Sequence, residues 1–378
     1  MLYMPISYLY YLENDFTKLE YLALHGVYSG VVAIFEVPSG YIADVWGRKP
    51  ALIIGLLFGI FGFSVYSFTG GLWFFLLAEV LLGIGHSMLS GADSAILYDT
   101  LLEHKKEKKY IKHEGNITAV GNLSEVAAAL FVSVFIFSNY RSYFQLQTVI
   151  AFIGLICTFF LREPRTHETK LSGGMKDIIN IVKYVFMQNK NLRNITIFSA
   201  IIGFSSLSMA WLAQPILEAM QINEKFFGFS WAGLNLIVAL GSIMAIPISK
   251  NLNYVNGLLY IAIPLSLGFI AISYNISLWT VLPLSIFYFV RGTAHPILKK
   301  YINELTSSEK RATVLSMRSL LIRIMFLIAA PILGIITERY SLSTGILLSG
   351  VSILIPTLII VPILIRSHNK EISNSLNI

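Results

Sequence analysis

Charged residues are scarce in this chain of 378 residues: lysine, arginine, aspartate and glutamate make up 13% of it, whereas 55% is hydrophobic. A soluble fold of this length needs a polar surface, and so few charges do not provide one. The mean hydropathy of +0.69 agrees with this reading. We therefore exclude a soluble protein and expect the apolar residues to face lipid.

The chain has a single cysteine, Cys157, which excludes a disulfide framework and a structural zinc site. It also lacks the Gly-x-x-x-x-Gly-Lys-Ser/Thr, His-Glu-x-x-His and Gly-x-Ser-x-Gly patterns, which mark ATP hydrolysis, zinc proteolysis and serine hydrolysis. The pair Gly83-x-Gly85 is too short for a dinucleotide loop. We expect no catalytic residue, no metal, no cofactor, and a protein that is not an enzyme.

Long apolar runs are abundant instead. A helix needs about 20 apolar residues to cross the hydrocarbon core, and eleven runs approach that length. Their spans are 21–44, 50–68, 72–101, 114–137, 142–161, 193–217, 226–249, 254–273, 277–298, 312–337 and 342–365. Residues 1–12 are apolar but too short to span, and without a basic start they do not resemble a signal peptide. We interpret them as the second half of a first helix, which brings the count to twelve.

Most of the 28 lysines and arginines fall on one side of this topology. Short cytoplasmic loops collect such residues, so we expect the central linker and the C-terminus to lie in the cytoplasm of a multi-pass protein of the cell membrane. The asymmetry also accounts for the net charge of +7, and we expect no nucleic-acid partner.

The longest polar interval separates six apolar segments from six more. We predict an N-terminal half at 1–161, a linker at 162–192, a C-terminal half at 193–365 and a cytoplasmic tail at 366–378. Within the linker, apolar residues recur at helical spacing while lysines occupy another face, which suits an amphipathic helix on anionic lipid. A solvated linker is the alternative. The apolar positions are Met175, Ile178, Val182, Val185 and Phe186, and the basic ones Lys176, Lys183 and Lys190.

A short loop between the second and third predicted helices carries the most specific motif. From Gly40 to Lys49 it reads Gly-Tyr-Ile-Ala-Asp-Val-Trp-Gly-Arg-Lys. This resembles Gly-x-x-x-Asp-Arg-x-Gly-Arg-Arg/Lys, the signature of the major facilitator superfamily, which occupies the same place in that topology. Glycines permit the tight turn, and the two cations suit the lipid headgroups.

The resemblance implies an all-α membrane protein of two six-helix bundles related by pseudo-twofold symmetry, here with an incomplete first helix. It implies a secondary transporter that moves a small solute by alternating access. It also implies that Asp44 docks on the start of the eleventh helix and latches the two halves, so that Gly40, Asp44, Gly47, Arg48 and Lys49 belong to a gate.

Four departures from the family pattern stand out. Val45 replaces an arginine of the motif, and Glu79 stands where proton-coupled members carry an arginine before a Gly-x-Gly segment. The fifth helix lacks a Gly-Pro pair, having only Gly115 and Gly121. The second and third departures argue against a standard proton/drug antiport mechanism. The fourth, the missing half of the first helix, suggests a misplaced start codon or a truncated copy.

Ionisable residues inside the membrane cost about 2.5 to 3.5 kcal/mol each on insertion scales, and so are functional candidates by default. Glu79, His86 and Asp93 lie seven residues apart on the fourth predicted helix and therefore share one face. We expect this face to contact the solute or a proton. A packing ion pair between helices is the alternative.

Other intramembrane charges extend the set of candidates. Glu36 and Arg318 fall at similar depth on the second and eleventh helices, so we predict an ion pair between them that breaks when the halves rock, with Arg323 as the alternative partner. Arg291 is the best candidate for an anion contact, because burial does not neutralise a guanidinium. Asp99 suits a gate or a cap. The solute or proton contacts are thus predicted to be Glu79, His86, Asp93, Glu125, Arg291 and Arg323.

From the sequence we favour export of a small solute driven by an ion gradient, with protons or another ion coupled to it, in a monomer surrounded by membrane lipid. Uptake of a nutrient is the runner-up. A truncated, non-transporting relic or sensor is a further alternative. An intramembrane enzyme is disfavoured, because positions seven apart on a helix lie about 10.5 Å from one another and do not converge on one metal ion.

Overall fold

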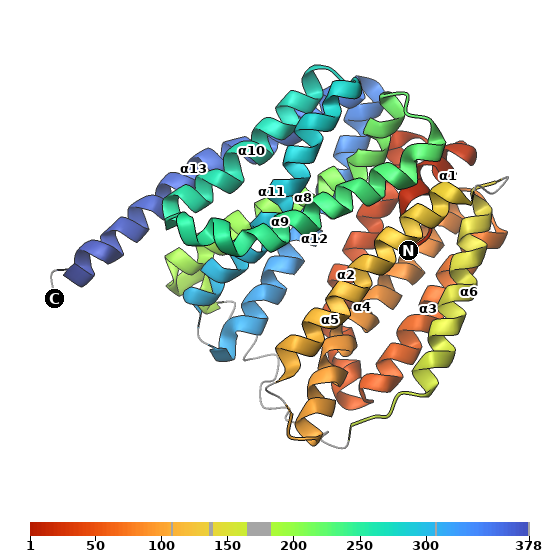
Figure 1. The fold of residues 1–378 in the computed structure, drawn as a ribbon, viewed down its shortest axis with the longest axis horizontal. Helices are drawn as coiled ribbons and strands as arrows, with labels where there is room; N and C mark the ends of the chain where they lie inside the picture. Colours follow the sequence, from red (N-terminus) through yellow and green to blue (C-terminus); the bar gives the residue numbers. More distant parts are fainter. Residues whose placement is uncertain (107–108, 136–138, 165–182, 307, 377–378) are drawn as a thin grey trace. The chain divides into compact units, whose positions relative to one another are not determined.

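A computed structural model describes residues 1–106, 109–135, 139–164, 183–306 and 308–376 (Figure 1). The described residues form helices joined by short turns, with no strand among them. The helices are α1 (Ser7–Glu13), α2 (Lys18–Val45), α3 (Arg48–Phe68), α4 (Leu72–Glu103), α5 (Tyr110–Val134), α6 (Arg141–Phe159), α8 (Lys190–Ala219), α9 (Phe227–Asn251), α10 (Tyr254–Tyr274), α11 (Val281–Glu304), α12 (Ser308–Arg339) and α13 (Leu342–Leu376). Each of the eleven predicted apolar runs is confirmed as a helix.

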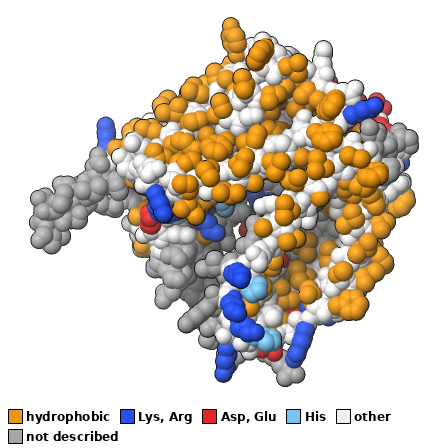
Figure 2. Space-filling view, in the orientation of Figure 1, with side chains coloured by type: hydrophobic (Ala, Val, Ile, Leu, Met, Phe, Trp, Pro, Cys, Tyr) orange, Lys and Arg blue, Asp and Glu red, His pale blue; other side chains and the backbone are white. Residues whose placement is uncertain are grey.

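Counting only the described residues, nine helices are long and apolar enough to cross a membrane, namely α3, α4, α6, α8, α9, α10, α11, α12 and α13. In α5 the apolar part of the described helix is shorter, Ala119–Val134. Figure 2 shows hydrophobic side chains over much of the visible surface and few charged ones. Large side chains such as Trp73 and Phe160 are 77% and 85% exposed. These exposed apolar groups suit a surface that faces lipid, as the composition predicts.

The first twelve residues form a short helical piece, as the sequence predicts. A turn at Met4–Ile6 runs into α1, and the chain reverses at Asp15, which has a φ of 61°. Thr17 then starts α2 with a capping box: its hydroxyl accepts from the Glu20 N–H at 3.2 Å, and the Glu20 carboxylate accepts from the Thr17 N–H at 2.9 Å. The reciprocal bonds satisfy two donors that a helix N-terminus otherwise leaves open.

The described chain divides into two compact units. Unit 1 comprises Met1–Leu171, Asn223–Ala232 and Leu327–Gly334, and unit 2 comprises Ser172–Ile222, Gly233–Phe326 and Ile335–Ile378. The six-plus-six arrangement and the boundaries at 161, 192 and 365 stay predictions. α13 continues as a helix to Leu376, through most of the predicted tail.

The predicted amphipathic helix of the linker falls mostly outside the described residues, including Met175, Lys176, Ile178 and Val182. Its last part is described as a single helical turn, Tyr184–Gln188, in which Val185 is fully buried.

Unit 1 is built around α4, which packs on both α2 and α3, while α6 lies beside α3 (Figure 1). Glycines set these close approaches. A Cβ on Gly85 of α4 would lie 2.8 Å from the Gly55 carbonyl oxygen of α3, and a Cβ on Gly83 would lie 2.9 Å from the Val31 side chain of α2. Small residues at crossings let helix backbones approach, and this is how membrane helices associate in the absence of a hydrophobic driving force.

Unit 2 packs in a similar way around α8, α10, α11 and α13. α9 and α11 meet at Gly241 and Gly292, where an added Cβ would collide with the backbone oxygens of Phe289 and Val238 on the opposite helix. Phe198 of α8, Phe269 of α10 and Phe287 of α11 are fully buried, so large rings fill the space between the helices.

The crossing of α3 and α4 yields a stability prediction. Gly85→Ala forces its methyl group against the backbone of α3, and overpacking of this kind costs about 1–3 kcal/mol. Gly59→Ala is the matched control, because nothing lies within 4 Å of a Cβ at Gly59. We expect thermal unfolding of the purified protein in detergent to show a lower midpoint for Gly85→Ala alone. Equal midpoints would contradict the crossing.

Candidate functional site

The carboxylate of Glu79 lies in a buried polar cluster that joins four helices of unit 1. Its Oε1 accepts hydrogen bonds from the Tyr66 hydroxyl at 2.6 Å and the Tyr11 hydroxyl at 3.0 Å, and it lies 3.3 Å from Nδ1 of His25. The two tyrosine hydroxyls are 2.7 Å apart. The four side chains come from α1, α2, α3 and α4. We call Tyr11, His25, Tyr66 and Glu79 the Glu79 cluster.

Aromatic rings enclose the Glu79 cluster. Phe75 packs edge-on against both Tyr11 and Tyr66, and Tyr21 packs edge-on against His25 with ring centroids 4.7 Å apart. The side chains of Glu79 and His25 are only 5% and 3% exposed. Hydroxyl and imidazole groups therefore replace the water that a carboxylate needs, and a buried ionisable group so partnered is tolerated.

The remaining two residues of the predicted α4 face lie in different surroundings. His86, seven residues beyond Glu79, is half-buried, and its ring lies 6.0 Å from that of Tyr28 on α2. Asp93 is exposed. Exposure along this face thus increases from Glu79 to Asp93, so His86 and Asp93 are the more accessible of the three predicted contacts.

The loop from Gly40 to Lys49 forms the end of α2 and the start of α3. Gly47 has a φ of +112°, a backbone conformation that favours glycine. The next residue, Arg48, is half-buried, and its Nε lies 3.3 Å from Oδ2 of Asp99 on α4. The predicted role of Asp99 as a cap or gate therefore has a concrete partner, the first arginine of α3. Asp44 lies in the last turn of α2, and its side chain is outside the described residues.

Glu163, just after α6, caps the N-terminus of α3. Its two carboxylate oxygens accept from the backbone N–H groups of Arg48 and Lys49, each at 2.7 Å. The Lys49 side chain in turn donates to the Phe159 carbonyl at 2.8 Å. A carboxylate at a helix N-terminus satisfies open donors and complements the helix dipole. A Cβ at Gly47 would come within 2.9 Å of Glu163 Oε1, so the glycine also makes room for this cap.

Two arginines of unit 2 have neutral partners. The guanidinium of Arg291 on α11 lies over the Tyr288 ring, 5.2 Å from its centroid, a cation–π contact. Arg318 on α12 is half-buried, and its Nε donates to the Ser199 hydroxyl of α8. Arg323 is half-buried on α12.

The other predicted residues lie in unit 1. Glu125 is 38% exposed, and its Oε1 lies 2.7 Å from the amino group of Met1. Glu36 is half-buried on α2, and its backbone carbonyl accepts from the Ser39 hydroxyl at 3.0 Å. Gly40 is half-buried on α2, with open space around a Cβ. The ion pair between Glu36 and Arg318 joins residues of different units and stays a prediction, as do the solute-contact and gate roles of all these residues.

Sequence reasoning did not single out His25, His295, Glu163 and Ser199. The rule that marks intramembrane ionisable groups applies equally to His25 in the run 21–44 and to His295 in the run 277–298, so a signal for both was present. The sequence gives no comparable signal for Glu163, because its role as a cap depends on the end of α6 lying next to the start of α3.

The Glu79 cluster gives a second stability prediction. Tyr66→Phe removes one donor to Glu79 and one partner of Tyr11, and an unsatisfied buried polar group costs about 1–3 kcal/mol. We expect a lower unfolding midpoint in detergent. Tyr340→Phe, at a site 76% exposed, is the control and is expected to unfold as the unchanged protein does. A Tyr66→Phe protein as stable as this control would mean that the cluster does not hold the four helices.

The cap that Glu163 forms on α3 gives a third prediction. Glu163→Gln removes the negative charge and one of the two acceptors of the cap, and hydrogen bonds to charged groups are worth about 1.5–3 kcal/mol. We expect faster hydrogen exchange at the first backbone amides of α3, measured by mass spectrometry. Glu218→Gln, exposed near the end of α8, serves as the control. Unchanged exchange at Arg48 and Lys49 would rule out the cap.

Known proteins with similar sequences identify the family of this chain. The sequence profile of the family described as Major Facilitator Superfamily matches residues 1–330. An uncharacterized MFS-type transporter of Bacillus subtilis (strain 168), YxaM, is 24% identical over 369 residues, which are 95% of this chain and 90% of the relative. The class G tetracycline resistance protein of Vibrio anguillarum is 24% identical over 304 residues, 78% of this chain and 74% of that protein.

The crystal structure of a mutant form of the nucleoside transporter NupG has the same fold. It superposes with a TM-score of 0.80 at 13% identity, over 97% of this chain and 96% of that one. The sequence prediction of an all-helical membrane protein of this type is thereby confirmed. The profile match, the apolar helices and the shared fold show that this chain belongs to the Major Facilitator Superfamily of multi-pass membrane transporters.

Proposed function

We propose that the protein exports a small solute across the cell membrane by alternating access, driven by an ion gradient. Family membership carries the proposal, since it makes the chain a transporter. The likeness to a protein named for tetracycline resistance favours export over uptake. The absence of a Gly-x-x-x-x-Gly-Lys-Ser/Thr sequence from the chain favours a gradient over ATP hydrolysis by the protein itself.

The face of α4 that carries His86 and Asp93 is the best candidate for solute contact. Asp93 is exposed and lies on a mainly apolar helix, where an acidic group attracts a cation or a proton. Glu79, in contrast, is enclosed among its tyrosines, and we assign it to holding the four helices rather than to the solute. Glu125, Arg291 and Arg323 remain candidates for the same path.

The loop that begins α3 is the best candidate for a gate. Gly40, Asp44, Gly47, Arg48 and Lys49 provide it, and the anchoring of Arg48 to Asp99 and of the α3 N-terminus to Glu163 supports its role as a rigid element of unit 1. Glu36 and Arg318 would pair in one state of the transport cycle and part in another. We further propose that the C-terminus lies in the cytoplasm, which the distribution of lysine and arginine favours.

Uptake of a nutrient is the second candidate. A transporter named for nucleosides shares this fold, and the same rocking of two repeats can deliver a solute in either direction.

The proposal is tested by the accumulation of a panel of fluorescent cationic, neutral and anionic compounds in bacteria that produce the protein, compared with bacteria carrying the empty vector. Export lowers accumulation of at least one compound. We expect Asp93→Asn to lose about tenfold or more of that effect at equal protein in the membrane, because a contact worth about 1.4 kcal/mol changes binding tenfold. Glu338→Gln, exposed near the end of α12, is the matched loss of a carboxylate and is expected to export normally.

Three other results would revise the proposal. Raised accumulation would replace export by uptake. No effect on any cationic, neutral or anionic compound would favour a non-transporting protein. Full activity of Asp93→Asn would remove the α4 face from the solute path.

A further inference from the structure

The helices of unit 2 carry ionisable groups of one sign in their middle portions. The sequence contains no aspartate or glutamate between Glu224 and Glu304, and none between Glu309 and Glu338. Across these same stretches lie four residues with basic side chains away from the helix ends, Arg291, His295, Arg318 and Arg323. Unit 1 differs, because Glu36, Glu79, Asp93 and Glu125 lie within its helices.

Two of these basic residues lie with Lys299 along a single face of α11. Arg291, His295 and Lys299 are four residues apart, and side chains at this spacing lie one above the other on a helix. Arg291 is at the middle of α11 and Lys299 near its end. A stripe of basic side chains therefore runs from the end of α11 toward the middle of unit 2.

Arg318 on α12 adds a further cation near His295. Both Arg318 and Lys299 lie within electrostatic range of the His295 ring. A Cβ on Gly203 of α8 would lie 3.3 Å from Nη2 of Arg318, so the glycine keeps space for the guanidinium. The hydroxyl of Ser199 orients Arg318 but carries no charge to balance it. Neither Arg318 nor Lys299 forms an ion pair with a described carboxylate of unit 2.

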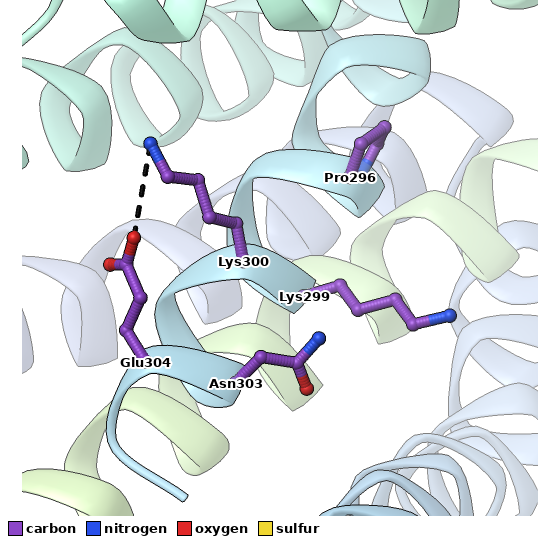
Figure 3. Close-up of a pocket in the computed structure, with 5 residues that line it drawn as sticks. All are labelled: Pro296, Lys299, Lys300, Asn303 and Glu304. Atoms are coloured by element: carbon purple, nitrogen blue, oxygen red, sulfur yellow. Dashed lines mark ion pairs between the residues drawn. The ribbon is translucent and has the colours of Figure 1, made fainter.

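A groove opens beside Lys299 (Figure 3). It has a volume of about 560 Å³ and is lined by Pro296, Lys299, Lys300, Asn303 and Glu304 of α11. Lys300 pairs there with Glu304, with Nζ and Oε1 3.9 Å apart. Lys299 extends away from that pair. Among the described residues of unit 2, Lys300 therefore has an acidic partner, whereas the adjacent Lys299 has none.

We propose that Lys299, His295 and Arg318 form an anion-binding path in unit 2, and that the transported solute carries a carboxylate or phosphate group. Several cations gathered without a counter-charge are costly inside a membrane and are balanced by an anion. A guanidinium binds carboxylate and phosphate through paired hydrogen bonds. The ammonium of Lys299 captures the anion at the groove, and Arg318 holds it deeper in the unit. This inference names the solute class and rests on the proposed transport function.

Thermal unfolding of the full chain in detergent tests the binding step directly. The probes are inorganic phosphate and acetate, titrated against sodium chloride at constant ionic strength. A ligand that binds only the folded protein raises its midpoint, so we expect a saturable rise with phosphate or acetate. Lys299→Gln and Arg318→Gln are expected to raise the half-saturating concentration about tenfold, the effect of losing one contact of about 1.4 kcal/mol. Lys300→Gln is the matched control and is expected to respond as the unchanged protein does.

Lys299 is exposed, so Lys299→Gln is expected to fold even where Arg318→Gln does not. The response of Lys299→Gln to anions is therefore sufficient to test the proposed path. No saturable rise in the unchanged protein would overturn the proposal. An equal loss of response in Lys300→Gln would also overturn it, because the effect would then reflect general surface charge.

The predicted pair of Glu36 with Arg318 offers the same guanidinium a competing anion. Glu36→Gln removes this competitor, so the anion response should persist at an equal or lower half-saturating concentration. Loss of the response in Glu36→Gln would show that it depends on the acidic residue, and would overturn the path.

Failure of the anion path and failure of transport are separable. If anions do not raise the unfolding midpoint and Lys299→Gln exports compounds normally, the anion-binding path is wrong and the proposed export stands. A saturable anion response in a protein that alters the accumulation of no compound in cells supports the binding path and removes the proposed export.

Discussion

Ionisable groups within these helices need partners supplied by the protein, because no water is available in the hydrocarbon core. Glu79 shows how the constraint is met. Its carboxylate is enclosed, and Tyr11, Tyr66 and His25 supply the polar contacts that water would provide. Since each partner comes from a different helix, one buried carboxylate links α1, α2, α3 and α4. The packing of unit 1 around α4 depends on this cluster and on the glycine crossings beside it.

The same need for partners is met differently by the charged groups inside the two units. In unit 1, the acidic residue Glu79 is enclosed, whereas Asp93 is exposed. In unit 2 the interior groups are basic, and Arg291 and Arg318 have a ring and a hydroxyl as neighbours rather than a carboxylate. A group that lacks a counter-charge within its own unit is suited to bind a charged ligand, whereas an enclosed and partnered group is suited to structure. Partnering is thus the basis on which we assign Glu79 to structure and propose Arg318 for ligand binding.

The loop that marks the family is held by contacts that its motif does not contain. Arg48 pairs with Asp99, and Glu163 caps the first turn of α3. Both carboxylates lie outside residues 40–49, so the motif defines only part of the structure around it. The left-handed backbone at Gly47 and the carboxylate of Glu163 occupy adjoining space. The glycine of the motif consequently serves both the turn and the cap.

The sequence alone determined the helical class, the eleven long helices, the membrane setting and the family, because lipid imposes long apolar runs and a loop motif is local. It also identified Glu79 as exceptional. Only the tertiary structure decided that Glu79 is enclosed while Asp93 is exposed, and that Glu163 caps α3. The spacing of seven places residues on one face of α4, but burial depends on which neighbouring helices cover each turn. Those neighbours come from distant parts of the chain, and helical periodicity carries no information about them.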